Sequence, residues 1–194
     1  MSDDTSQGDY WDNVTAYRPP EERIDAALRW RTPELDLHGY YLHEIPEEVW
    51  TMVHLRELHL YYNRLTTLPD DVANLADLTW LNIGNNELTT LPGTIGRLTQ
   101  LTRLDGNDNQ LTAMPDSIGN LRGLTSLYLQ SNQLTEVPGS FARLSLLRTL
   151  FLSDNKIRAL PDWLATMPRL ECLVVAGNPL THVPPQLAER FGIG

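Results

Sequence analysis

The chain has 194 residues and a mass of 22.0 kDa, which suits one compact domain or one short repeat array. Its 15 basic and 25 acidic residues give a formal net charge of −10, so nucleic acid and anionic membranes are not expected partners. The single cysteine excludes an internal disulfide, and the acidic, polar N-terminus is unlike a signal peptide. We therefore expect a cytoplasmic protein.

Residues 1–31 are expected to form an acidic tail followed by a capping helix. The segment 20–30, PEERIDAALRW, has a proline and two glutamates in its first turn, and Ile24, Ala27 and Leu28 form one apolar stripe. A helix with one apolar face suits the end of a repeat array, whose first unit would otherwise expose its leucines to water. The aromatic residues of the tail are expected to pack on this cap or on the convex side, with a docking peptide as the alternative.

From residue 32 onward a pattern recurs every 23 residues without a gap, which indicates a repeat architecture. One full unit, residues 78–100, reads LTWLNIGNNELTTLPGTIGRLTQ. Leucine recurs at Leu58, Leu81, Leu104, Leu127, Leu150 and Leu173. Asparagine recurs at Asn63, Asn86, Asn109, Asn132, Asn155 and Asn178. Seven such units occupy residues 32–194.

The pattern predicts the shape of each unit. The segment LxxLxL alternates in its second half, as a short strand with one buried face does. The asparagine that follows can be buried only if both ends of its amide find partners, which the backbone of neighbouring units would supply. The Leu-Pro pair then ends the extended segment and opens a short helix. No unit can bury its leucines alone, so the units must stack.

These motifs resemble the leucine-rich repeat family, in particular the 23-residue intracellular type found in Ras-group and small bacterial repeat proteins. The resemblance implies an α/β solenoid. It would be a short, right-handed horseshoe with a concave parallel β-sheet, convex short helices or 3₁₀ turns, and an N-terminal capping helix. Arg190, Phe191 and Ile193 are expected to close the last unit, so the chain looks close to complete. Gly106 replaces an inward leucine, and we expect either a repacked core or a small pocket there.

The outward positions of the concave sheet carry the functional prediction, because the repeat does not dictate their identity. Several large aromatic residues and one arginine fall on this face, as in protein-binding hot spots. The N-terminal half of the face is acidic and the C-terminal half apolar, which suits a protein partner with a basic region. The predicted partner-binding residues are His59, Tyr61, Tyr62, Trp80, Asn82, Arg103, Asp105, Asn107, Tyr128, Phe151 and Val174.

Catalytic and metal sites have weaker signals. Asp36, His38, Glu57 and His59 should lie on two neighbouring strands, where carboxylates and imidazoles are able to hold a divalent cation. The sequence has no metal-ligand spacing motif, nucleophile constellation or phosphate-binding loop, so we expect no enzyme, cofactor or metal. The leading prediction is a monomeric protein-interaction module. The alternatives are small-ligand or metal binding on the concave face, and a structural, self-associating repeat protein.

Overall fold

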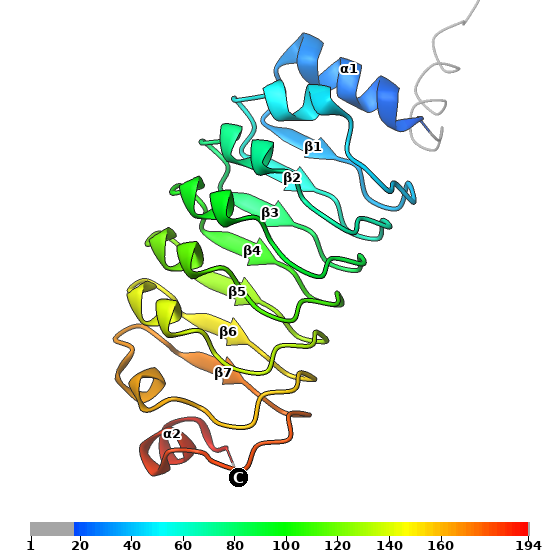
Figure 1. Ribbon diagram of the computed structural model, residues 1–194. Helices are drawn as coiled ribbons and strands as arrows, with labels where there is room; N and C mark the ends of the chain where they lie inside the picture. The colour runs from blue at the N-terminus through cyan, green and yellow to red at the C-terminus, as the bar shows by residue number, and fades with distance from the viewer. Residues whose placement is uncertain (1–17, 194) are drawn as a thin grey trace, which may run out of the picture.

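The computed structural model describes residues 18–193 and shows a stack of 23-residue coils (Figure 1). Each coil contributes one short strand to a single parallel sheet of seven strands in sequence order. The predicted architecture, a solenoid whose repeats build one parallel sheet, is thus confirmed. The strands are β1 (Glu34–Asp36), β2 (Glu57–His59), β3 (Trp80–Asn82), β4 (Arg103–Asp105), β5 (Ser126–Tyr128), β6 (Thr149–Phe151) and β7 (Cys172–Val174).

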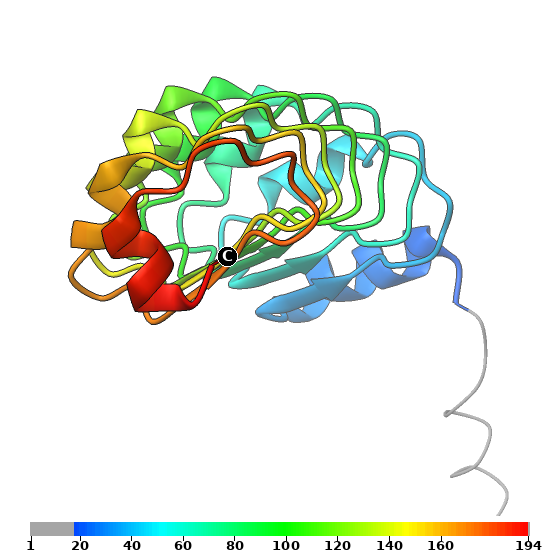
Figure 2. The same ribbon diagram turned by 90° about the horizontal axis from the view of Figure 1, so that it is seen from below.

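The register of the sheet equals the sequence repeat. Leu35 pairs with Leu58, and Leu58 with Leu81, so equivalent positions of successive coils lie side by side. Backbone hydrogen bonds continue beyond the short strands, since the Tyr62 N–H donates to the Gly84 carbonyl at 3.1 Å. Seen along the stack, the coils overlay one another closely (Figure 2). A residue's place in its coil therefore determines its neighbours in the next coil.

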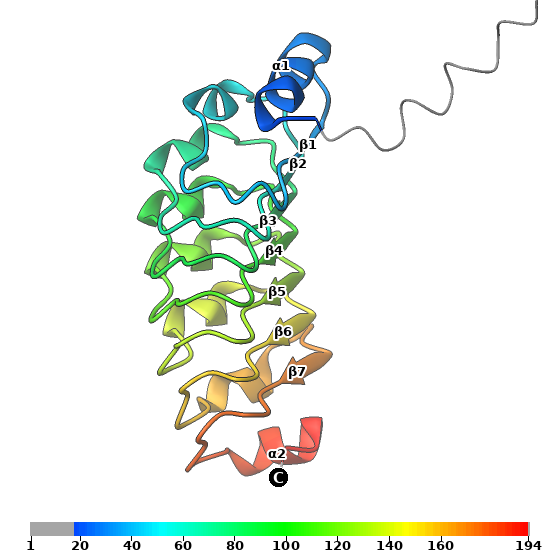
Figure 3. The ribbon, with the colours of Figure 1, turned by 90° about the vertical axis from the view of Figure 1, so that its right-hand side faces the viewer.

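The convex side is built from 3₁₀ turns, which lie along the face opposite the strands (Figure 3). Each turn follows a proline, whose fixed φ suits the first residues of a helix but whose missing N–H would break a strand. This agrees with the predicted start of each convex segment. The turns are Glu47–Thr51, Asp70–Asn74, Gly93–Arg97, Asp116–Asn120, Gly139–Arg143 and Asp162–Thr166.

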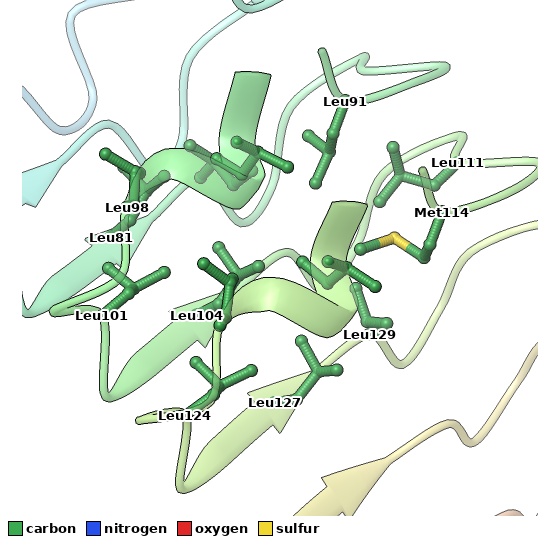
Figure 4. Packing of buried hydrophobic residues seen from close by; sticks show 14 of the residues in the cluster. Leu81, Leu91, Leu98, Leu101, Leu104, Leu111, Met114, Leu124, Leu127 and Leu129 are labelled. Atoms are coloured by element: carbon green, nitrogen blue, oxygen red, sulfur yellow. The ribbon is translucent and has the colours of Figure 1, made fainter. Parts of the chain in front are cut away.

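The core lies between the sheet and the convex turns. Leu81, Leu104 and Leu127 are fully buried and lie next to one another in successive coils (Figure 4). At Gly106 the core is repacked, because Leu129 of the next coil reaches into the space: a β-carbon at Gly106 would lie 3.3 Å from Leu129 Cδ2. This agrees with the first of the two expectations for Gly106.

The repeated asparagines form the predicted ladder. Asn109 is buried, and its Oδ1 accepts the Leu88 N–H at 2.9 Å while its Nδ2 donates to the Ile83 carbonyl at 2.9 Å. Asn86 makes the same contacts one coil earlier, with the Leu65 N–H and the Leu60 carbonyl. Each amide thus gives a buried N–H of the preceding coil its acceptor and supplies a second donor to a carbonyl that also binds the asparagine of its own coil.

Helices cover both ends of the stack (Figure 1). Helix α1 (Pro20–Trp30) has the predicted bounds and buries Ile24 and Ala27, but Leu28 is 37% exposed, contrary to the predicted stripe. The acidic tail expected before α1 lies outside the described residues.

Helix α2 (Pro185–Phe191) packs on the last coil. Arg190 extends from it over the final convex turn, and its guanidinium donates to the carbonyls of Ala165 and Met167 at 2.6 and 3.2 Å. These carbonyls would otherwise face the next coil of the stack. Among residues 18–193, no helix is long and apolar enough to cross a membrane.

Candidate protein-binding surface

Aromatic rings from the first coils touch one another along the concave face. The rings of His38 and Tyr61 stack in parallel, with centroids 4.6 Å apart. His59 lies edge-on to Tyr61 at 6.5 Å and edge-on to Trp80 at 4.6 Å. The contacts follow from the register, because His59 and Trp80 occupy outward places on the adjacent strands β2 and β3.

The same line of contacts continues into the C-terminal half through an arginine. The Arg103 guanidinium carbon lies 4.4 Å from the Trp80 ring centroid and 5.0 Å from that of Tyr128. Tyr128 in turn meets Phe151 edge-on at 5.1 Å. We call this continuous line the stacked row. Its members are His38, Tyr61, His59, Trp80, Arg103, Tyr128 and Phe151.

A buried carboxylate holds the centre of the stacked row. Asp105 accepts hydrogen bonds from Arg103 Nε at 2.8 Å and Nη2 at 3.1 Å, and from the Trp80 indole at 2.6 Å. Asp105 is 4% exposed and His59 is 8% exposed, unlike the open surface that their outward places predict. Trp80 covers both side chains. Asp105 therefore holds Arg103 and Trp80 in position, and the partly exposed side chains of these two residues form the surface that a partner would contact.

Two pKa values on this face are shifted. The hydrogen bond to Asp105 is the largest cause that raises the pKa of Arg103, so this arginine keeps its charge while it stacks between two rings. Burial raises the pKa of the Tyr61 hydroxyl, and the negative charge of Asp36 raises it further. Tyr61 therefore stays neutral well into the alkaline range.

Replacement of Asp105 by alanine tests its positioning role. The Asp105→Ala variant leaves the partly buried Trp80 N–H without its acceptor and releases Arg103, which should lower the free energy of unfolding by about 2 kcal/mol. Urea unfolding followed by circular dichroism measures this loss. A variant as stable as wild type would show that the hydrogen bonds around Asp105 do not hold the row together.

Four further predicted residues adjoin the stacked row, and one of them, Tyr62, touches it directly, because its ring meets Tyr61 edge-on with centroids 5.5 Å apart. Tyr62 is 58% exposed and has a φ of 56°, at a place that the other coils fill with glycine, asparagine, aspartate or serine. Asn82 accepts the Gly84 N–H at 3.1 Å, and Asn107 donates to Asp108 at 2.7 Å. Both amides thus serve turns at the end of the strands. Val174 extends the apolar surface next to Phe151.

The polar cluster expected on the first two strands is arranged differently from the prediction. Asp36 pairs with His38 at 2.7 Å, while His59 faces Glu57 and Glu34 at 3.6 and 3.7 Å. Glu34 and the role of His38 in the stacked row were missed by sequence reasoning. The 23-residue register contains the signal for both, since it places Glu34 beside Glu57 and His38 beside Tyr61.

One hollow of the described residues, of about 660 Å³, lies on the convex side between the first two 3₁₀ turns and is bordered by Trp50 and Pro69. Another, of about 600 Å³, lies at the loop edge between Tyr41 and Tyr62 and borders the stacked row only at its end, at His38. Along the rest of its length the row is an open surface of the kind that protein partners cover.

The sequence matches two family descriptions that agree with this architecture. Residues 35–132, just over half of the chain, match the family described as "leucine-rich repeat region", and residues 122–180 match "leucine rich repeat". The chain belongs to the leucine-rich repeat family. No curated protein matches the sequence.

Solved structures show the same fold. A leucine-rich repeat protein of Leptospira interrogans has a TM-score of 0.76 and 28% identity over 85% of this chain and 48% of its own. An internalin of Listeria monocytogenes has a TM-score of 0.74 and 27% identity over 85% and 47%. The chain thus spans about half the length of these bacterial proteins.

A plant structure is also similar. The ectodomain of the membrane receptor kinase GASSHO1/SCHENGEN3 of Arabidopsis thaliana, in complex with CASPARIAN STRIP INTEGRITY FACTOR 2, has a TM-score of 0.74 and 32% identity. The match covers 82% of this chain and 20% of the plant chain. Leucine-rich repeat domains generally mediate protein–protein interaction, and such proteins are typically non-catalytic.

Proposed function

We propose that this chain is a non-catalytic interaction module that binds a protein partner through the concave face, with the stacked row at the centre of the contact. The observation that carries the proposal is the continuous line of rings and one arginine from His38 to Phe151. Tryptophan, tyrosine and arginine are the residues that dominate binding energy at protein interfaces. The complex of the plant receptor ectodomain supports the use of this fold for such binding.

The stacked row is ordered before a partner arrives. Asp105 holds Arg103 and Trp80 by hydrogen bonds, and Tyr128 lies against both Arg103 and Phe151. Side chains that are already fixed lose little conformational entropy on binding, so more of the contact energy appears as affinity. The short strands add to this, because the backbones of β2 to β6 are paired on both sides within the sheet.

The distribution of charge along the concave face favours one orientation of the bound partner. Glu34, Asp36 and Glu57 lie at the N-terminal end of the sheet, while Phe151 and Val174 lie at the other end. A partner whose basic region meets β1 and β2, and whose apolar region meets β5 to β7, complements both halves. The polar contacts steer the encounter and the apolar contacts slow dissociation.

Alanine substitutions at the apolar end test the proposal. Biotinylated protein captures partners from native lysate, and Tyr128→Ala and Phe151→Ala should each weaken capture of the wild-type partner about tenfold or more. Both side chains are partly buried, so we expect each substitution to lower the free energy of unfolding by about 1 kcal/mol without unfolding the protein. Thermal melting checks that the variants stay folded.

A matched control removes an aromatic side chain elsewhere. Tyr41 is 67% exposed at the loop edge and lies outside the stacked row, so Tyr41→Ala should capture the partner as wild type does. Capture that survives both concave substitutions, or that Tyr41→Ala abolishes, contradicts binding through the row.

We place the module in the cytoplasm as a monomer that needs no cofactor. Cys172 is the only cysteine and is partly buried, which suits a reducing compartment. Helices α1 and α2 lie over the terminal coils, which favours a stack that does not extend by self-association.

A further inference from the structure

Three potential metal ligands converge on strands β1 and β2, outside the hydrogen-bonded centre of the stacked row. One atom each from Glu34, Glu57 and His59 lies within 4.8 Å of the others. The sheet enforces this meeting, because Glu34 and Glu57 are register partners and His59 follows Glu57 by two residues on the same face. The two carboxylate side chains are 58% and 41% exposed, whereas that of His59 is only 10% exposed.

The imidazole of His59 is directed at the carboxylates without bonding to them. Its Nε2 lies 3.7 Å from Glu34 Oε1 and 3.6 Å from Glu57 Oε2, both longer than a hydrogen bond. Within residues 18–193, neither ring nitrogen of His59 forms a hydrogen bond. The imidazole therefore faces two carboxylates within ion-pair distance, and its Nε2 is available to a metal ion that the carboxylates would share.

The spacing fits a tetrahedral ion. Zinc bonds of about 2.1 Å place the ligand atoms of a tetrahedral site about 3.4 Å apart, so the two distances from His59 Nε2 need to shrink by only a few tenths of an ångström. The two carboxylate oxygens lie within 4.8 Å of each other and would also have to move closer together. The flexible ends of two exposed glutamates permit such a movement. The edges of an octahedral magnesium site, with bonds of about 2.1 Å at right angles, are near 3.0 Å and fit less well.

We infer that Glu34, Glu57 and His59 form a binding site for a divalent transition metal, with Zn²⁺ as the best match. One nitrogen and two oxygens are ligands that Zn²⁺ accepts, and three protein ligands leave one position to water. Two carboxylates with a neutral imidazole carry a charge of −2, which the ion would neutralise. An ion reaches the cluster through the exposed ends of the two glutamates, which also border a hollow of about 410 Å³ that His59 does not line.

The surroundings hold the imidazole in place. Trp80 packs edge-on against the His59 ring at 4.6 Å, and its own indole is fixed by the hydrogen bond to Asp105. Arg56 borders the same hollow, yet within the described part of the chain it forms no ion pair with either glutamate. The carboxylates are therefore not neutralised by a neighbouring cation.

Metal titration tests this inference independently of any protein partner. Full-length protein is freed of metal with a chelator, then titrated with Zn²⁺ by calorimetry and with Co²⁺ by visible absorption, which reports tetrahedral geometry. We expect one ion per chain at this site, bound about tenfold or more weakly by Glu34→Gln, Glu57→Gln and His59→Gln. The glutamates are exposed, so their variants stay folded even if the change at buried His59 disturbs the core.

The control is His38→Gln, which removes a concave imidazole that pairs with Asp36 and lies outside the cluster. Its affinity for Zn²⁺ should equal that of wild type. The inference is overturned by absence of saturable binding at millimolar Zn²⁺, by wild-type affinity in either glutamate variant, or by an equal loss in His38→Gln.

Discussion

The Asn109→Ala variant should lose about 2–3 kcal/mol of unfolding free energy, because the buried Leu88 N–H loses its acceptor and the Ile83 carbonyl keeps only the second of its two amide donors, Asn86 Nδ2 at 3.1 Å. Asn109 Oδ1 accepts the Leu88 N–H, and its Nδ2 donates to the Ile83 carbonyl, both at 2.9 Å. Water cannot replace the amide, since Leu88 and Ile83 are fully buried in the core. Equilibrium unfolding in urea, followed by circular dichroism, gives the change.

An asparagine outside the ladder provides the control. Asn120 ends the 3₁₀ turn Asp116–Asn120 and is exposed, so Asn120→Ala should change stability by less than about 0.5 kcal/mol. A loss below about 1 kcal/mol in Asn109→Ala would mean that the ladder contributes little, and that leucine packing alone holds the coils together.

Gly96→Ala should destabilise the protein by about 3 kcal/mol, because the convex turns of neighbouring coils approach too closely for a side chain. A β-carbon at Gly96 would lie 2.4 Å from the Ser117 carbonyl oxygen and 2.9 Å from its carbonyl carbon. These are backbone atoms, so a rotamer change cannot relieve the clash. The whole turn Asp116–Asn120 has to move away, which loosens the core beneath it.

Gly93 is the matched control, three residues earlier in the same turn. Nothing lies within 4 Å of a β-carbon placed there, so Gly93→Ala should be neutral or slightly stabilising through the unfolded chain. Thermal melting of the two variants side by side separates the steric effect from the general cost or benefit of replacing glycine. Equal melting temperatures would contradict the close approach of the turns.

The repeat made most of the architecture predictable. Leu58 and its equivalents must be buried together, the asparagines need backbone partners, and proline must end each extended segment, so one register satisfies all three requirements. The cap was only partly predictable. Leu28 belongs to the helical stripe, but its exposure depends on how the helix docks on the first coil, which the sequence of the helix alone does not encode.

The candidate site was predictable as a face but not as a set of contacts. The register assigns Trp80, Arg103 and Tyr128 to the concave side. The register does not predict that Arg103 stacks between the rings of Trp80 and Tyr128, or that Asp105 is buried beneath them. Those features depend on side-chain rotamers at positions where neighbouring coils carry different residues, so no periodic signal reports them.

The ladder and the stacked row would respond differently to growth of the array by duplication. An extra 23-residue unit inserted between any two coils finds its asparagine partners on both sides, because every rung is alike. Placed between β4 and β5, however, the same unit would separate Arg103 from Tyr128 and cut the line of rings in two. Lengthening is therefore tolerated by the scaffold everywhere, but by the recognition surface only beyond Phe151.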